Sequence, residues 1–60
     1  MPLVEVTLWD RQATEETVPK IIERVTDAVA ESSGAARETV LVIVRSVPPQ
    51  HTGVAGKPGA

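Results

Sequence analysis

The sequence predicts an α/β fold built on one strand–helix–strand unit with parallel strands. Three observations predict it: a two-residue apolar alternation in residues 2–9, a three- and four-residue apolar repeat in residues 14–33, and a second apolar run in residues 39–45. Strand, helix and strand in this order form a right-handed crossover with parallel strands. We expect one domain spanning residues 1–60.

The first predicted strand covers residues 2–9 and has two different faces. One face carries Val4, Val6 and Leu8, which alternate with polar neighbours. The other face is mixed, because Leu3 and Trp9 flank its polar positions. This pattern suggests that another subunit, and not water, covers the mixed face. Trp9 is the only aromatic residue, and an anchor at the edge of the core or at an interface is favoured over a substrate contact.

The predicted helix begins either at Thr14, with a local irregularity, or near Thr17. The choice stays open because Pro19 is tolerated only in the first turns of a helix. Gly34 is the natural left-handed residue that ends it. The apolar stripe comprises Val18, Ile21, Ile22, Val25, Ala28 and Val29, and charged residues including Lys20 occupy the opposite face.

The second predicted strand, residues 39–45, is apolar on both faces, which is typical of a parallel or interface strand. Residues 46–60 are rich in turn-forming residues. They predict either a small hairpin around Thr52-Gly53 or an arm lying on a neighbouring subunit, and the last four residues are expected to be mobile. Two strands and one helix cannot cover their own apolar surfaces, so association is expected.

Composition narrows the classes of function. A chain of 60 residues buries only about 60% of its unfolded surface, so oligomerisation is the expected source of stability. There is no cysteine and one histidine, and we expect no metal and no cofactor. The net charge of -2 without a basic cluster argues against nucleic-acid and anionic-membrane partners. The longest apolar run, residues 40–44, is too short to span a bilayer, and we expect a cytoplasmic protein.

Pro2 is the residue that offers the most unusual chemistry. If Met1 is removed, Pro2 carries a free secondary amine, and an apolar pocket would lower its pKa from the ordinary α-amino value of about 7.7 to 8. Such an amine is largely neutral near pH 7, as a general base must be. If Met1 stays, the Pro2 nitrogen is an amide without basicity, and Pro2 only begins a strand.

The chain resembles the 4-oxalocrotonate tautomerase family over nearly its full length. The resemblance rests on the proline after Met1, the strand–helix–strand core, and a tail with Pro48-Pro49-Gln50-His51 followed by spaced glycines. It implies that two subunits join into a four-stranded sheet and that three such dimers form a hexamer. It also implies a tautomerase, an isomerase that moves a proton between keto and enol forms of a 2-oxo or 2-hydroxydienoate acid, with Pro2 as general base.

The resemblance also implies arginines that hold the substrate carboxylate, one in the loop after the first strand and one at the start of the second. Arg11 matches the first with a one-residue shift, and its alternative interpretation is a turn residue paired with Asp10. Leu41 stands where the second is expected. Arg45 lies four residues further on the same face and is our second candidate for substrate binding, although a solvated charge at a strand end is its simpler interpretation. Arg37, just before the strand, is a further alternative. Thr52 replaces an aromatic residue that usually follows the tail histidine.

Three functional interpretations follow. The first is a small enzyme that acts on a carboxylic acid with Pro2 and Arg11. The second is a supporting, non-catalytic subunit of a mixed hexamer, which the absence of the second arginine fits well. The third is a family fold kept for interaction alone. Neither the substrate nor the choice between identical and mixed subunits follows from the residues.

Overall fold

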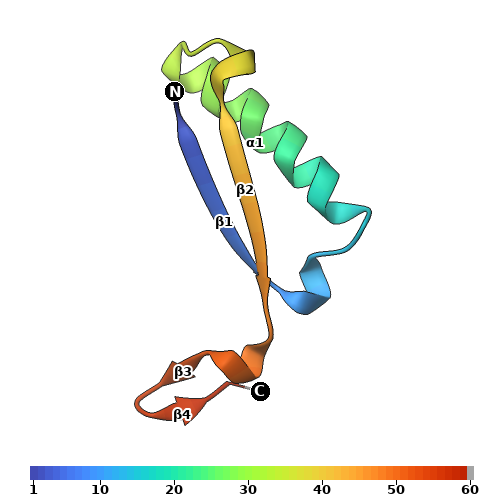
Figure 1. Cartoon of the computed structure of the whole chain (residues 1–60), viewed down its shortest axis with the longest axis vertical. Coiled ribbons are helices and arrows are strands. Elements are labelled where there is room, and N and C mark those ends of the chain that lie inside the picture. Colours follow the sequence, from blue (N-terminus) through green and yellow to red (C-terminus); the bar gives the residue numbers. More distant parts are fainter. Residues whose placement is uncertain (60) are drawn as a thin grey trace.

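The computed structural model describes residues 1–59 and contains the predicted strand–helix–strand unit. Its regular elements are β1 (Leu3–Trp9), α1 (Thr17–Ser33), β2 (Leu41–Val47), β3 (Gly53–Val54) and β4 (Lys57–Pro58). Short 3-10 helices cover Asp10–Gln12, Arg37–Thr39 and Pro49–His51. Figure 1 shows α1 lying along one face of the β1–β2 pair, with the β3–β4 hairpin set apart from both.

Strands β1 and β2 are parallel, as predicted, and their register runs from Leu3 opposite Leu41 to Trp9 opposite Val47. The second strand begins two residues later than predicted, because the residues before it form a turn. Thr39 donates both its backbone N–H and its hydroxyl to the carbonyl oxygen of Ala36, at 2.9 and 2.7 Å. A threonine that makes these local bonds favours a turn over a strand ladder.

The helix begins at Thr17, which decides between the two predicted starts. The Thr14 hydroxyl accepts hydrogen bonds from the backbone N–H groups of Glu16 and Thr17, at 3.3 and 3.0 Å, and so caps the helix from outside. Pro19 is then the third helical residue, where its missing N–H costs no hydrogen bond. At the other end Gly34 has φ of 79°, and its N–H donates to the Ala30 carbonyl at 3.0 Å, as predicted.

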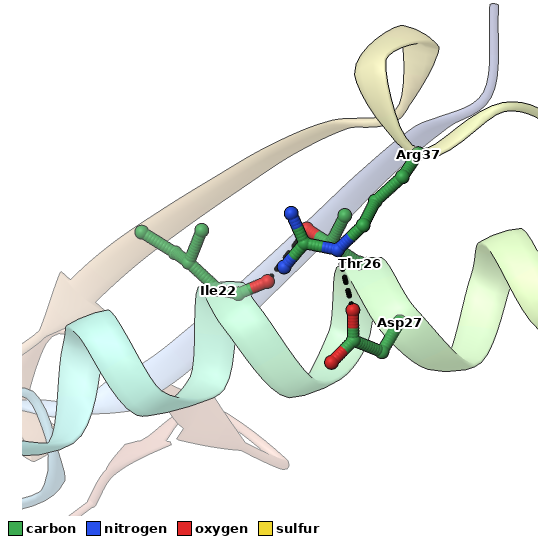
Figure 2. A network of polar contacts seen from close by, with 4 residues as sticks. All are labelled: Ile22, Thr26, Asp27 and Arg37. Carbon is green, nitrogen blue, oxygen red and sulfur yellow. Dashed lines mark hydrogen bonds and ion pairs between the residues drawn. The ribbon is translucent and has the colours of Figure 1, made fainter.

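Residues 1–59 of the single chain have almost no buried core. Thr26, 8% exposed, is the only buried residue among residues 1–59, and its hydroxyl donates to the Ile22 carbonyl at 2.6 Å (Figure 2). The predicted apolar stripe of α1 is only partly covered, because Ile22 and Ala28 are exposed. On the sheet face that carries Leu3 and Leu41, these side chains are 57% and 48% exposed. No other part of the described chain covers these apolar surfaces.

The shape of the chain agrees with this lack of a core. The radius of gyration is 14.2 Å and the principal extents are 42 × 26 × 13 Å. A compact domain of this length has a radius of gyration of about 10 Å. Much of the difference comes from the hairpin, which projects away from the strand–helix–strand unit (Figure 1). The chain is therefore more extended than a compact domain of its length.

The C-terminal hairpin is present, but its turn is not at Thr52-Gly53. Strands β3 and β4 pair antiparallel, with Val54 opposite Lys57, so the turn lies at Ala55-Gly56. Both turn residues have positive φ, 56° and 81°, as a type I′ turn requires. Two of the four residues expected to be mobile, Lys57 and Pro58, lie in β4. Ala60, the last of the four, lies outside the described residues.

One ion pair ties the helix to the segment that leads into β2. The Arg37 guanidinium donates to the Asp27 carboxylate at 2.6 Å (Figure 2). This hydrogen bond, together with the attraction of the carboxylate's charge, raises the pKa of Arg37 above its ordinary value.

Within residues 1–59, no helix is both long and apolar enough to cross a membrane.

Candidate functional site

Pro2 lies at the amino end of the sheet, one residue before β1, and is half-buried. Its carbonyl oxygen accepts a 2.9 Å hydrogen bond from the backbone N–H of Leu41, the first residue of β2. Met1, by contrast, is 92% exposed. The backbone thus fixes Pro2 against β2 and leaves the residue before it open to solvent.

Leu41 occupies a position at which a cation would lie close to Pro2. It stands opposite Leu3 in the register and is 48% exposed. The structure therefore places an apolar residue beside Pro2, where the resemblance implied an arginine.

Arg11 lies at the opposite end of β1 from Pro2. It belongs to the 3-10 helix Asp10–Gln12, which directly follows the strand. The seven residues of β1 cover roughly 23 Å at 3.3 Å per residue. The structure therefore does not bring Pro2 and Arg11 of one chain together, and a site that contains both takes its arginine from a neighbouring chain.

Arg11 borders a depression of about 540 Å³ between the end of β1 and the start of α1. The residues that line it are Leu8, Arg11, Gln12, Thr17, Lys20 and Ile21. Leu8 and Ile21 are half-buried, whereas Arg11 and Lys20 are exposed. The Thr17 hydroxyl, at the first turn of α1, donates to the Gln12 carbonyl and joins the two segments that form the depression. The result is an apolar surface bordered by two cations.

A second, smaller depression of about 250 Å³ lies at the carboxyl end of the strands. Its lining residues are Thr7, Leu8, Trp9, Gln12, Val47 and Thr52. Trp9 is half-buried there and keeps one side toward the open space. The interpretation of Trp9 as an anchor at the edge of the core or at an interface stays a prediction.

The remaining candidate cations are engaged elsewhere. Arg45 stands opposite Thr7 and lies 3.5 Å from the Glu5 carboxylate, with both side chains more than half exposed. Arg37 is held by Asp27, near the far end of α1. These two are the ion pairs within residues 1–59, so neither Arg11 nor Lys20 belongs to one. Arg11 and its neighbour Asp10 in the same turn thus form no ion pair with each other.

Lys20 is the residue of this depression that the sequence reasoning missed. It was placed on the charged face of the helix together with the other solvent-exposed residues. The signal that points to it is the spacing of Thr17, Lys20 and Ile21, which puts all three on one side of the first helical turns.

Within the described range, no three acidic or histidine side chains gather into a group that suits a metal ion.

The fold and the position of Pro2 define the class of protein. It is a small strand–helix–strand protein with a proline directly before its first strand. Comparison with known proteins makes the class specific. The family described as tautomerase enzyme matches residues 2–60. A probable tautomerase of Ralstonia nicotianae is 45% identical over 58 residues, which cover 97% of this chain and 81% of the relative. The 2-hydroxymuconate tautomerase of Bacillus subtilis is 37% identical over 57 residues, covering 95% and 90%.

The chain belongs to the tautomerase family, within its 4-oxalocrotonate tautomerase group, and is a tautomerase-like isomerase. A solved structure described as a heterohexamer 4-oxalocrotonate tautomerase from Chloroflexus aurantiacus has the same fold. It superposes with a TM-score of 0.83 and 24% identity, covering 97% of this chain and 92% of that one. The expected family and its fold are thus confirmed.

Proposed function

We propose that the protein catalyses keto–enol proton transfer in a small 2-oxo or 2-hydroxydienoate carboxylic acid, with the free amine of Pro2 as general base. The observation that carries this proposal is the placement of Pro2: half-buried and fixed by Leu41, behind a Met1 that is 92% exposed. An exposed methionine before a small residue is accessible to the aminopeptidase that would free the amine.

The mechanism follows from the chemistry of that amine. In its neutral form it takes a proton from the hydroxyl group or the α-carbon of the substrate and returns it at a conjugated carbon. Arg11 of a neighbouring chain holds the carboxylate and stabilises the enolate charge that develops, because its planar guanidinium binds a carboxylate in two places. This division of roles follows from the separation of Pro2 and Arg11 along one β1.

The assembly in this proposal is a hexamer of three dimers, each dimer with a four-stranded sheet. The support is that no apolar side chain is buried within residues 1–59 of the single chain, and that Leu3 and Leu41 are exposed on the open sheet face. A site that uses residues of two chains also requires association. We place this activity in the cytoplasm.

The substrate in this proposal is a small dicarboxylate such as 2-hydroxymuconate, the compound for which the Bacillus subtilis relative is named. Arg11 binds one carboxylate, and Arg45 is the candidate for the other. Arg45 lies on the same sheet face as Leu41, about 13 Å further along β2. To act, it must exchange its exposed partner Glu5 for the substrate, and an exposed ion pair of this kind is weak.

Replacement of Pro2 tests the proposal. In Pro2→Ala the amine is primary, with a different basicity and geometry, and we expect turnover of 2-hydroxymuconate to fall by roughly a hundredfold or more. Pro19→Ala is the matched control, because the first helical turn tolerates either residue. Turnover by Pro2→Ala equal to that of the control would refute the role of Pro2.

A second candidate function is a supporting subunit of a mixed hexamer. Leu41 is the observation that favours it, since a chain without a cation beside Pro2 can still supply Arg11 to a partner. The Chloroflexus aurantiacus protein is a precedent for mixed assembly within the fold. Native mass measurement of the purified chain separates the two functions: an active hexamer of this chain alone excludes the supporting role.

A further inference from the structure

Arg11 has a second cation beside it in the same depression. Arg11 comes from the 3-10 helix after β1, and Lys20 comes from the second turn of α1. The volume of about 540 Å³ lies within the range of small-ligand sites. None of its lining residues is acidic, so the local charge is positive.

Lys20 is available for a ligand. Glu16, the residue before α1, lies four residues before Lys20, and Glu23 of α1 lies three residues after it. Both are close enough in spacing to compete for its ammonium group. Neither forms an ion pair with Lys20 in the structure, whose ion pairs use Arg37 and Arg45 instead. Arg37 and Arg45, the proposed replacements for the missing cation, therefore have ion-pair partners, whereas Lys20 has none among residues 1–59.

The remaining lining determines which ligand fits. Leu8 and Ile21 give an apolar surface, and the hydroxyl of Thr17 and the amide of Gln12 add polar groups. A carboxylate lies well between a guanidinium and an ammonium, while the carbon chain behind it contacts the leucine and isoleucine. A phosphate would use the cations equally but would leave the apolar surface uncovered.

We infer that Lys20 is a substrate-binding and specificity-determining residue, which together with Arg11 holds the carboxylate of an apolar or conjugated acid and supplies the cation that Leu41 cannot. This inference rests on the proposed function and adds Lys20 to the residues that bind the substrate. Lys20 acts on binding alone, since a cation that holds the carboxylate throughout lowers KM without changing kcat.

Lys20→Gln removes the charge and keeps most of the side-chain length. We expect KM for 2-hydroxymuconate to rise roughly tenfold with kcat little changed, as for the loss of one charge-assisted contact. Lys20→Arg should keep KM close to that of the wild type. Arg24→Gln is the matched control, because it removes the same charge from the same helix outside the depression, and it should leave KM unchanged.

A binding measurement separates this inference from the role of Pro2. In the Pro2→Ala background, calorimetry with muconate, a dicarboxylate without the 2-hydroxyl group, should show weaker binding when Lys20 is also replaced by glutamine. Equal affinity with and without Lys20 overturns the inference even if Pro2 is essential. A shift of Lys20→Gln to a smaller native mass also overturns it, because Lys20 would then be an interface residue.

Discussion

The backbone N–H of Leu41 donates a 2.9 Å hydrogen bond to the carbonyl oxygen of Pro2, so the first residue of β2 lies directly beside the proposed base. A side chain at position 41 is therefore well placed to influence a substrate bound at the Pro2 amine. Here that side chain is apolar and about half exposed. The chain thus keeps the position of the base and lacks a cation next to it.

Leu41→Arg should restore that cation. We expect kcat/KM for 2-hydroxymuconate to rise roughly tenfold, because a guanidinium beside the reacting carbons stabilises the enolate as it forms. Leu41→Gln is the control, since it removes the apolar side chain without adding charge and should not raise the rate. Equal rates for the two variants would show that the charge has no access to the substrate.

The strand–helix–strand order was predictable from the sequence because apolar periodicity changes from two to three or four and back. The residues at which each element begins and ends were less predictable, because local hydrogen bonds determine them. Thr39 bonds to Ala36 and delays β2, and Thr14 caps α1 from outside. The hairpin turn was misplaced for a similar reason: Ala55-Gly56 adopts positive φ without the asparagine or aspartate that usually signals such a turn.

The candidate site was only partly predictable from the sequence. The chemical identity of Pro2 and Arg11 was evident, but their separation by the length of β1 is a property of the parallel register. Lys20 escaped notice because helical periodicity places it among ordinary surface charges. Lys20 lies near Arg11 because the 3-10 helix after β1 turns the chain back toward the start of α1. No residue pattern in the sequence predicts that turn.

Retention of Met1 should abolish activity. Protein made while the methionine aminopeptidase is inhibited differs from the processed protein only by Met1, so its Pro2 nitrogen is an amide and cannot accept a proton. We expect turnover to fall in proportion to the fraction of chains that keep Met1, as read by mass spectrometry. The fold should be unaffected, because Met1 is 92% exposed and the Pro2 carbonyl still binds Leu41. Full turnover from uniformly retained chains would exclude the amine mechanism.

Gly34 should matter for stability through its backbone alone. Its φ is 79°, and a Cβ built there meets no atom within 4 Å. Gly34→Ala should therefore lower the free energy of unfolding by about 1 to 2 kcal/mol, the cost of a left-handed alanine. Gly34→Asn should cost less, because asparagine tolerates this conformation. Chemical denaturation at one fixed protein concentration measures both, and equal stability of all three proteins would contradict the prediction.

Thr26 tests whether packing or hydrogen bonding dominates at the one buried residue of the described chain. Thr26→Val removes the hydroxyl that donates to Ile22 and keeps the side-chain volume. We expect the free energy of unfolding to change by no more than about 1 kcal/mol, because one hydrogen bond contributes little net stability. Thr26→Ser keeps the hydroxyl and removes a methyl group, which should cost about 1 kcal/mol or more. A larger loss for valine than for serine would reverse this assignment.

Substrates with one or two carboxylates should distinguish Arg11 from Arg45. Arg11→Ala should raise KM for both 2-hydroxymuconate and the monocarboxylate phenylenolpyruvate, each roughly tenfold, because every substrate needs its first carboxylate held. Arg45→Ala should raise KM for the dicarboxylate alone. Glu5→Gln releases Arg45 from its partner at 3.5 Å and should lower KM for the dicarboxylate. If Arg45→Ala and Glu5→Gln leave both constants unchanged, Arg45 is a solvated charge at the strand and Arg11 acts without it.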